Sequence, residues 1–236
     1  MRHLKKQILY AIAVIALTAC DEGRIYNDNT IIGEKGGSIH LTVETEGTET
    51  WPSGYTLAVA GFTDGNSYAL VSKNIGMIDE SGKCNVTLSG IPPEVNTIEL
   101  CALDRLRRRI ATFQSTPYSA SLDIREIEFP ATDMSMTAAV QKEIFNTTCT
   151  NCHGGSGHAA ADLDLTEGKS VADLVMQESV KMQGLYRVKP GESAESVLYL
   201  ILGEGESADW SYDHSVEVVR QEKLDLIRNW IDGSIK

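Results

Sequence analysis

The sequence predicts a multidomain chain in which an all-β sandwich is followed by an all-α domain. Between residues 31 and 130, short runs rich in β-branched residues alternate with turn-forming residues, which is typical of an antiparallel sandwich. From residue 135 onward, apolar residues instead recur at helical spacing. A chain of 236 residues is long enough for two modest domains with separate cores.

Residues 1–19 have the features of an export signal. Basic residues near the start precede the apolar run 8–17, which is too short to cross a bilayer. The run ends in Leu-Thr-Ala-Cys, which resembles the lipobox of bacterial lipoproteins. This resemblance implies that the mature chain starts at Cys20, which carries acyl chains and anchors the protein in a membrane. An ordinary secretory signal is the alternative, and residues 20–30 are expected to form a tether.

The resemblance to lipoproteins also predicts the location of the protein. We expect an exported lipoprotein on the periplasmic side of a membrane, in the outer membrane or at the cell surface, because the signal directs the chain out of the cytosol. The inner leaflet, the outer membrane and the cell surface all stay open.

The first domain is expected to be an immunoglobulin-like or fibronectin-like sandwich spanning residues 31–130. Its predicted strands are residues 38–43, 56–60, 69–71, 85–88, 97–103 and 118–129. Glycine, asparagine and proline pairs separate them at the spacing of an antiparallel sandwich. Residues 130–133 would form the linker to the second domain.

Cys84 and Cys101 are a possible disulfide within the sandwich. If the chain folds into a hairpin about Pro92 and Pro93, the two cysteines lie nearly opposite each other on neighbouring strands. A cross-strand disulfide is then possible within the narrow distance limits of such bonds. Two buried free thiols that behave as small apolar residues are the alternative.

The second domain, residues 135–236, is expected to be helical. One apolar stripe occupies residues 139–145 and another occupies residues 216–231, so a first and a last helix should pack across each other. Shorter helices are expected at residues 170–176 and 193–202.

The run Cys149-Thr150-Asn151-Cys152-His153 is typical of a covalent c-type haem attachment site in an exported protein. On a helix, residues at i, i+3 and i+4 share one face, so both sulfurs and the imidazole would lie together. Cys149 and Cys152 would form thioether bonds to one haem c, and His153 would bind its iron as the proximal axial ligand. A protein with this attachment is expected to carry electrons.

The resemblance extends beyond these five residues. Segments 144–145, 149–155, 163–165, 185–191, 196–198 and 224–231 resemble the cytochrome c domains of planctomycetes and related bacteria, and the likeness covers residues 135–236. It implies an all-α cytochrome c domain of the class I layout with one haem c. The sequence contains no recognisable catalytic triad, nucleotide loop or pair of catalytic carboxylates, so we expect an electron carrier and not an enzyme.

The sixth iron ligand departs from that family, in which a Met-Pro element ahead of the last helix supplies it. No methionine follows Met182, and His214 stands in the loop before the last helix. His214 is therefore the expected distal ligand, with Met182 or Met176 as alternatives and an open iron as the third possibility. Arg187 and Lys189 could pair with the haem propionates or remain solvated.

The charge of the chain bears on its partners. A formal net charge of −12 argues against a nucleic-acid partner and favours a redox partner protein with a basic docking face. Three alternatives are weaker. A redox thiol module would follow a strand, a structural zinc site would need four ligands, and a peroxidase would usually need a second haem. A surface or periplasmic binding lipoprotein, whose haem domain senses or binds small ligands instead of carrying electrons, stays open.

Overall fold

The computed structural model describes residues 36–235, except for residues 77, 80, 122, 156, 158 and 204–210. The expected export signal, Cys20 and the whole of the expected tether therefore lie outside the described residues. Residues from 35 onward cluster as one compact unit. Within the described part of the chain, no helix has the length and apolar character needed to cross a membrane.

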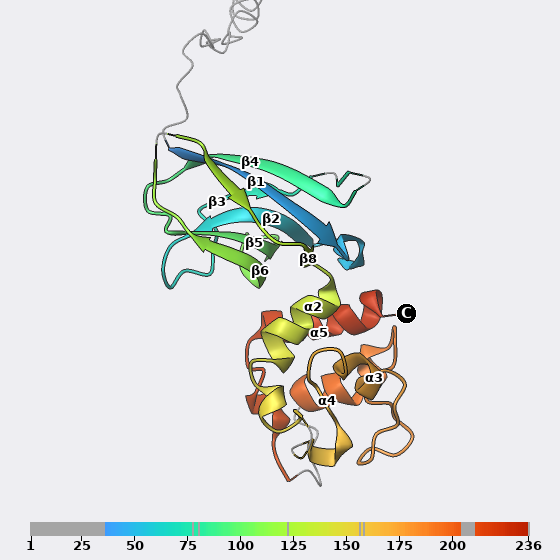
Figure 1. The fold of residues 1–236 in the computed structure, drawn as a ribbon. Coiled ribbons are helices and arrows are strands. Elements are labelled where there is room, and N and C mark those ends of the chain that lie inside the picture. Colours follow the sequence, from blue (N-terminus) through green and yellow to red (C-terminus); the bar gives the residue numbers. More distant parts are fainter. Residues whose placement is uncertain are drawn as a thin grey trace, which may run out of the picture. The chain divides into compact units, whose positions relative to one another are not determined.

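Two four-stranded β-sheets dominate the fold (Figure 1). The first contains β1 (Gly37–Glu46), β4 (Lys83–Ile91), β7 (Arg125–Glu128) and β8 (Thr132–Asp133). The second contains β2 (Tyr55–Phe62), β3 (Val71–Asn74), β5 (Thr97–Asp104) and β6 (Arg109–Pro117). Strand β1 pairs antiparallel with β4 and parallel with β7 and β8, whereas all pairs of the second sheet are antiparallel.

Alternation along the strands places the core between the two sheets. Ile39 and Leu41 of β1 are fully buried, whereas His40 between them is only half-buried. From the other sheet, Ile98 and Leu100 of β5 join the same core. Because successive side chains of a strand point to opposite faces, this pattern gives a sandwich with one apolar interior.

The predicted hairpin about Pro92 and Pro93 was wrong. Strand β4 pairs with β1, whereas β5 pairs with β2 and β6, so the two strands belong to different sheets. Cys84 lies in the main core and its thiol donates to the carbonyl of Ile75, whereas Cys101 lies in a separate small cluster. Both cysteines are free and buried, which agrees with the alternative of two buried thiols and not with the possible disulfide.

The prediction of an all-α domain after the sandwich was wrong as well, and with it the fold class. The α-helices of this half are α2 (Met136–Val140), α3 (Ser170–Leu174), α4 (Val197–Gly203) and α5 (Gln221–Asn229), with only 5, 5, 7 and 9 residues. Between α2 and α4 the chain forms mainly 3-10 turns, isolated β-bridges and loops. Glycines with positive φ, such as Gly168 and Gly184, recur there and interrupt helical turns.

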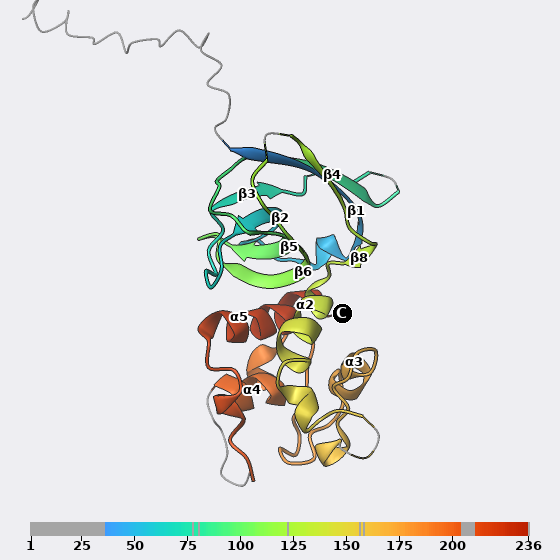
Figure 2. The same cartoon turned by 60° about the vertical axis from the view of Figure 1, so that its left-hand side comes forward.

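The first helix of this half nevertheless lies against the end of the last one, because α2 contacts the π-helical turn that follows α5 (Figure 2). A π-helical turn extends each of them, to Phe145 and to Ser234 respectively. Phe145 packs edge-on against Trp230 with ring centroids 5.9 Å apart, and the indole of Trp230 donates to the hydroxyl of Thr137. This contact fixes the end of the helix that leads into the Cys-x-x-Cys-His run.

The residues expected to form a linker instead continue the first sheet through β8. Trp51 donates its indole N–H to the carbonyl of Met134 at 2.6 Å, and both Met134 and Met136 are fully buried. The apolar core therefore runs without interruption from the sandwich into the helical half.

Candidate functional site

The Cys-x-x-Cys-His run begins with a 3-10 turn, Cys149–Asn151, and not on the face of an α-helix. The amides of Cys152 and His153 both donate to the carbonyl of Cys149, at 3.1 and 2.8 Å. These bonds close the run into a compact loop. The expected helical spacing is thus replaced by a tighter turn that still holds the residues of the motif together.

The two cysteines of this run differ in exposure. Cys152 is exposed, whereas Cys149 is half-buried and lines a pocket. Burial, and then the nearby charge of Glu217, raises the pKa of the Cys149 thiol to about 11. A redox-active or catalytic cysteine needs a depressed pKa, so this environment disfavours a thioredoxin-like function.

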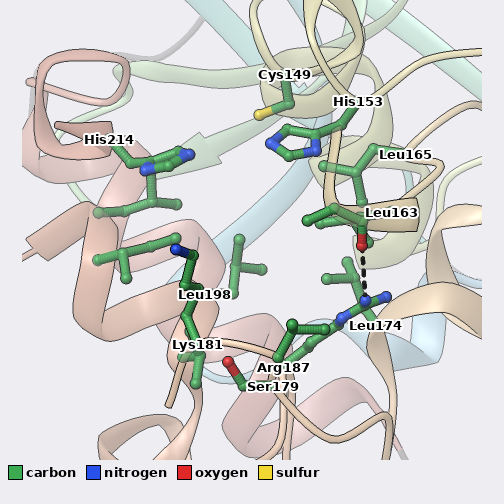
Figure 3. A pocket seen from close by; sticks show the side chains of 15 residues that line it. Cys149, His153, Leu163, Leu165, Leu174, Ser179, Lys181, Arg187, Leu198 and His214 are labelled. Atoms are coloured by element: carbon green, nitrogen blue, oxygen red, sulfur yellow. Dashed lines mark hydrogen bonds between the residues drawn. The ribbon is translucent and has the colours of Figure 1, made fainter. Parts of the chain in front are cut away.

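The pocket beside Cys149 has a volume of about 90 Å³ and is lined mainly by apolar side chains (Figure 3). Its apolar lining comprises Ala161, Leu163, Leu165, Leu174, Val180, Val197, Leu198, Ile201 and Leu202. The polar lining consists of His153, His214, Ser179, Lys181 and Arg187. This volume lies below the range of about 300–1,000 Å³ that is usual for cofactor and ligand pockets, so the lining residues, and not the size of the pocket, point to a cofactor.

His153 has a fixed ring orientation. Its Nδ1 lies 2.9 Å from the carbonyl oxygen of Ala160. Because a carbonyl can only accept, Nδ1 is the donor of this bond, and Nε2 is the ring nitrogen that is available to a ligand. Histidines that bind metals are typically oriented by such a bond, so the ring of His153 is oriented as a metal ligand would be.

His214 faces His153 across the pocket. It begins the 3-10 turn His214–Val216, which is capped by the carboxylate of Asp213. The two ring centroids are 6.1 Å apart with an interplanar angle of 28°, and Figure 3 shows the rings pointing toward each other. Burial, followed by the charge of His153, lowers the pKa of His214. A neutral imidazole is the form that binds a metal.

The spacing of the two rings fits one metal ion between them. A metal–nitrogen bond of about 2.0 Å and roughly 1.2 Å from nitrogen to ring centre, counted on both sides, place the centroids about 6.4 Å apart. The observed 6.1 Å agrees with this value. The arrangement therefore suits an iron with two axial imidazoles.

The polarity of the pocket fits a porphyrin as well. In Figure 3, Cys149 lies at one end of the pocket, and Ser179, Lys181 and Arg187 lie at the other. A haem carries its vinyl groups and its propionates on opposite edges. Cys149 and the basic groups thus lie at opposite ends of the pocket, as the vinyl and propionate edges of a haem would require.

The two cations predicted for the propionates are placed differently. Arg187 lines the pocket and is held by bonds from its guanidinium to the carbonyls of Asp173 and Ala161, at 2.9 and 3.2 Å. Lys189 is not among the lining residues and pairs with Glu195. Lys181, which sequence reasoning missed, lines the pocket instead. It stands in a polar segment without any local pattern that marks it.

The alternative iron ligands are not part of the pocket lining. Met176 is 51% exposed with a positive φ, and Met182 is half-buried outside the lining. Among the residues that the structure describes, no group of three or more His, Cys, Asp or Glu side chains is placed to hold a metal ion. A haem iron differs from such sites because the protein supplies only its two axial ligands.

Comparison with known proteins adds no relative to these observations. No family model, no curated protein and no solved structure matches the chain. The interpretation of the site therefore rests on its own residues.

Proposed function

We propose that this chain is an exported, lipid-anchored protein with one haem c, attached through Cys149 and Cys152, that transfers electrons. His153 and His214 would be its axial ligands. One observation carries the proposal, namely two imidazoles 6.1 Å apart that face each other beside the attachment cysteine in an apolar pocket. When bound, haem supplies a one-electron couple between two oxidation states of iron.

The residues of the pocket suit this function. The carbonyl of Ala160 orients His153, and burial keeps His214 neutral. The apolar lining excludes water and limits the reorganisation that accompanies a change of charge. Arg187 and Lys181 are placed to neutralise the propionates.

Two axial histidines favour electron transfer over small-ligand sensing or peroxidase chemistry. Both of those alternatives require an open coordination position. A position opposite His153 that is already faced by His214 leaves no such opening. Bis-histidine ligation also lacks the rise in potential that Met/His ligation gives, so we expect a potential below that of Met/His cytochromes.

The location and partner follow from the sequence. Cys20 would carry the lipid anchor, and the acidic chain would be steered toward a redox protein with a basic docking face. Electron exchange with such a partner should slow as ionic strength rises.

The test begins with expression of the full chain alongside c-type maturation factors. A denaturing gel stained for haem should show haem on the wild type, and none on the double variant Cys149→Ala/Cys152→Ala. Absorption spectra of His214→Ala should show the loss of one axial ligand, whereas Met182→Ala should match the wild type.

His40→Ala is the matched control, because His40 lies in β1 and hydrogen-bonds Thr87 within the sandwich. A wild type without covalent haem would refute the proposal. A His214→Ala spectrum identical to that of the wild type would refute the axial assignment alone.

A further inference from the structure

The carboxylate of Glu217 joins the two segments that carry the opposing histidines. One of its oxygens accepts a hydrogen bond from the hydroxyl of Thr148, the residue before Cys149. The other accepts from the phenol of Tyr212, two residues before His214. The backbone N–H of Glu217 also donates to the carbonyl of His214 at 3.1 Å.

We propose that Glu217 is a positioning residue that holds the His214 loop against the attachment turn and so keeps His214 at ligand distance. This inference rests on the proposed function. Glu217 does not itself contact the iron position. It acts through Thr148 on one side and Tyr212 on the other.

The residues on either side of His214 bury little apolar surface, although Val218 beyond Glu217 is buried in the core. Tyr212 is 49% exposed and Val216 is 55% exposed, so neither buries much apolar surface. A 3-10 turn of three residues has little stability of its own. The hydrogen bonds of Glu217 add to the contacts that this turn makes with α4 and tie it to the segment before Cys149.

Tyr212 connects Glu217 to the imidazole of His214. Its ring packs edge-on against His214, with centroids 5.3 Å apart and an interplanar angle of 87°. Fixing the phenol through Glu217 therefore limits the rotation of the His214 ring. Both bonds are accepted by a carboxylate, and hydrogen bonds to a carboxylate are stronger than those between neutral groups.

The test compares Glu217→Ala and Glu217→Gln with Glu167→Ala, a control that removes an exposed carboxylate from the same half of the chain. In the haem-loaded protein, cyanide must displace His214 to bind. Losing two charge-assisted bonds should make cyanide binding at least about tenfold faster in Glu217→Ala. Glu217→Gln keeps the length and hydrogen-bonding capacity of the side chain, so its rate of cyanide binding should lie between those of Glu217→Ala and the wild type. Glu167→Ala should bind cyanide at the wild-type rate.

A second measurement does not depend on haem. In unloaded protein, amide hydrogen exchange of residues 211–218 should be faster in Glu217→Ala than in the wild type, and the pair Thr148→Val and Tyr212→Phe should each show part of this effect. Because Glu217 is exposed, its replacement leaves the core intact. If the wild type binds haem but Glu217→Ala keeps the wild-type spectrum, cyanide rate and exchange, the inference is overturned while the proposed function stands. A wild type without haem refutes the proposed function, and hydrogen exchange alone then decides whether Glu217 holds the loop.

Discussion

Replacing Glu143 by alanine should destabilise the whole described unit, because this side chain joins the sandwich to the helical half. Glu143 lies in the π-helical turn after α2. One carboxylate oxygen accepts from the backbone N–H of Thr112 in β6 at 3.0 Å, and the other lies 2.6 Å from the ammonium of Lys223 in α5. Lys223 also donates to the carbonyl of Ile110.

The size of the loss in unfolding free energy follows from the polar groups that Glu143→Ala leaves without their partner. The Thr112 N–H loses its acceptor, and the Lys223 ammonium keeps only a neutral one. Breaking a fully buried ion pair costs about 3–5 kcal/mol. The side chains of Lys223 and Glu143 are 17% and 22% exposed, so solvent screens part of this cost. We expect a loss of about 2–3 kcal/mol in the free energy of unfolding. Glu143→Gln, which keeps an acceptor for Thr112, should lose less.

Urea unfolding followed by both tryptophan fluorescence and circular dichroism measures this loss. Since the core is continuous, both probes should report one transition at the same midpoint. Arg228→Ala is the control, because it breaks an ion pair with Asp225 that is far more exposed and should cost less than about 1 kcal/mol. A Glu143→Ala protein within about 0.5 kcal/mol of the wild type would refute the reasoning, because surface substitutions have effects of that size.

Two further predictions concern a backbone constraint and the thiols. Gly47→Ala should lower the free energy of unfolding clearly more than Gly65→Ala. Both glycines have φ near +70°, so both substitutions strain the backbone equally. A Cβ on Gly47 would also lie 2.5 Å from the Cβ of Ser135, whereas a Cβ on Gly65 would have no atom within 4 Å. Equal losses of unfolding free energy would contradict the clash. In unloaded native protein at pH 8, iodoacetamide should label Cys152 well before Cys149, because a thiol with a pKa of about 11 is about one-thousandth thiolate at that pH. Peptide mass spectrometry reads the order, labelling of Cys149 should accelerate as the pH rises toward 11, and equal rates at pH 8 would show that Cys149 is not shielded.

Local patterns predicted individual strands but not their partners. The runs within β1, β2, β4 and β5 were found because alternation and β-branched residues are properties of the strand itself. Their pairing depends on residues far apart in sequence, and the assumption that consecutive strands form a hairpin failed between β4 and β5. Cys84 and Cys101 were therefore placed together when they belong to separate clusters.

In the helical half, too, local patterns predicted elements but not the contacts between distant residues. Apolar stripes correctly predicted helices in the regions of α2 and α5, which bury Phe145 and Trp230 against each other. The chain between them is held by β-bridges and side-chain bonds, such as the bonds from Arg187 to two carbonyls. Such long-range bonds leave no periodic signal in the sequence, and a family resemblance was no substitute for them.

The candidate site was predictable where its residues form a short sequence motif. The Cys-x-x-Cys-His run and the loop position of His214 pointed to Cys149, His153 and His214, which line one pocket, whereas Cys152 does not line it. Lys181 and Glu217 were not found, because their importance arises only when the chain brings them next to the pocket or between its two sides.

Covalent haem on the attachment peptide is the most direct test of the proposed function. The full chain, matured in a host with c-type maturation factors, would be unfolded and digested, and the peptide containing Cys149 and Cys152 weighed by mass spectrometry. We expect that peptide to carry the mass of one haem and to absorb visible light after denaturation. Free thiols on both cysteines, with no added mass, would contradict the assignment.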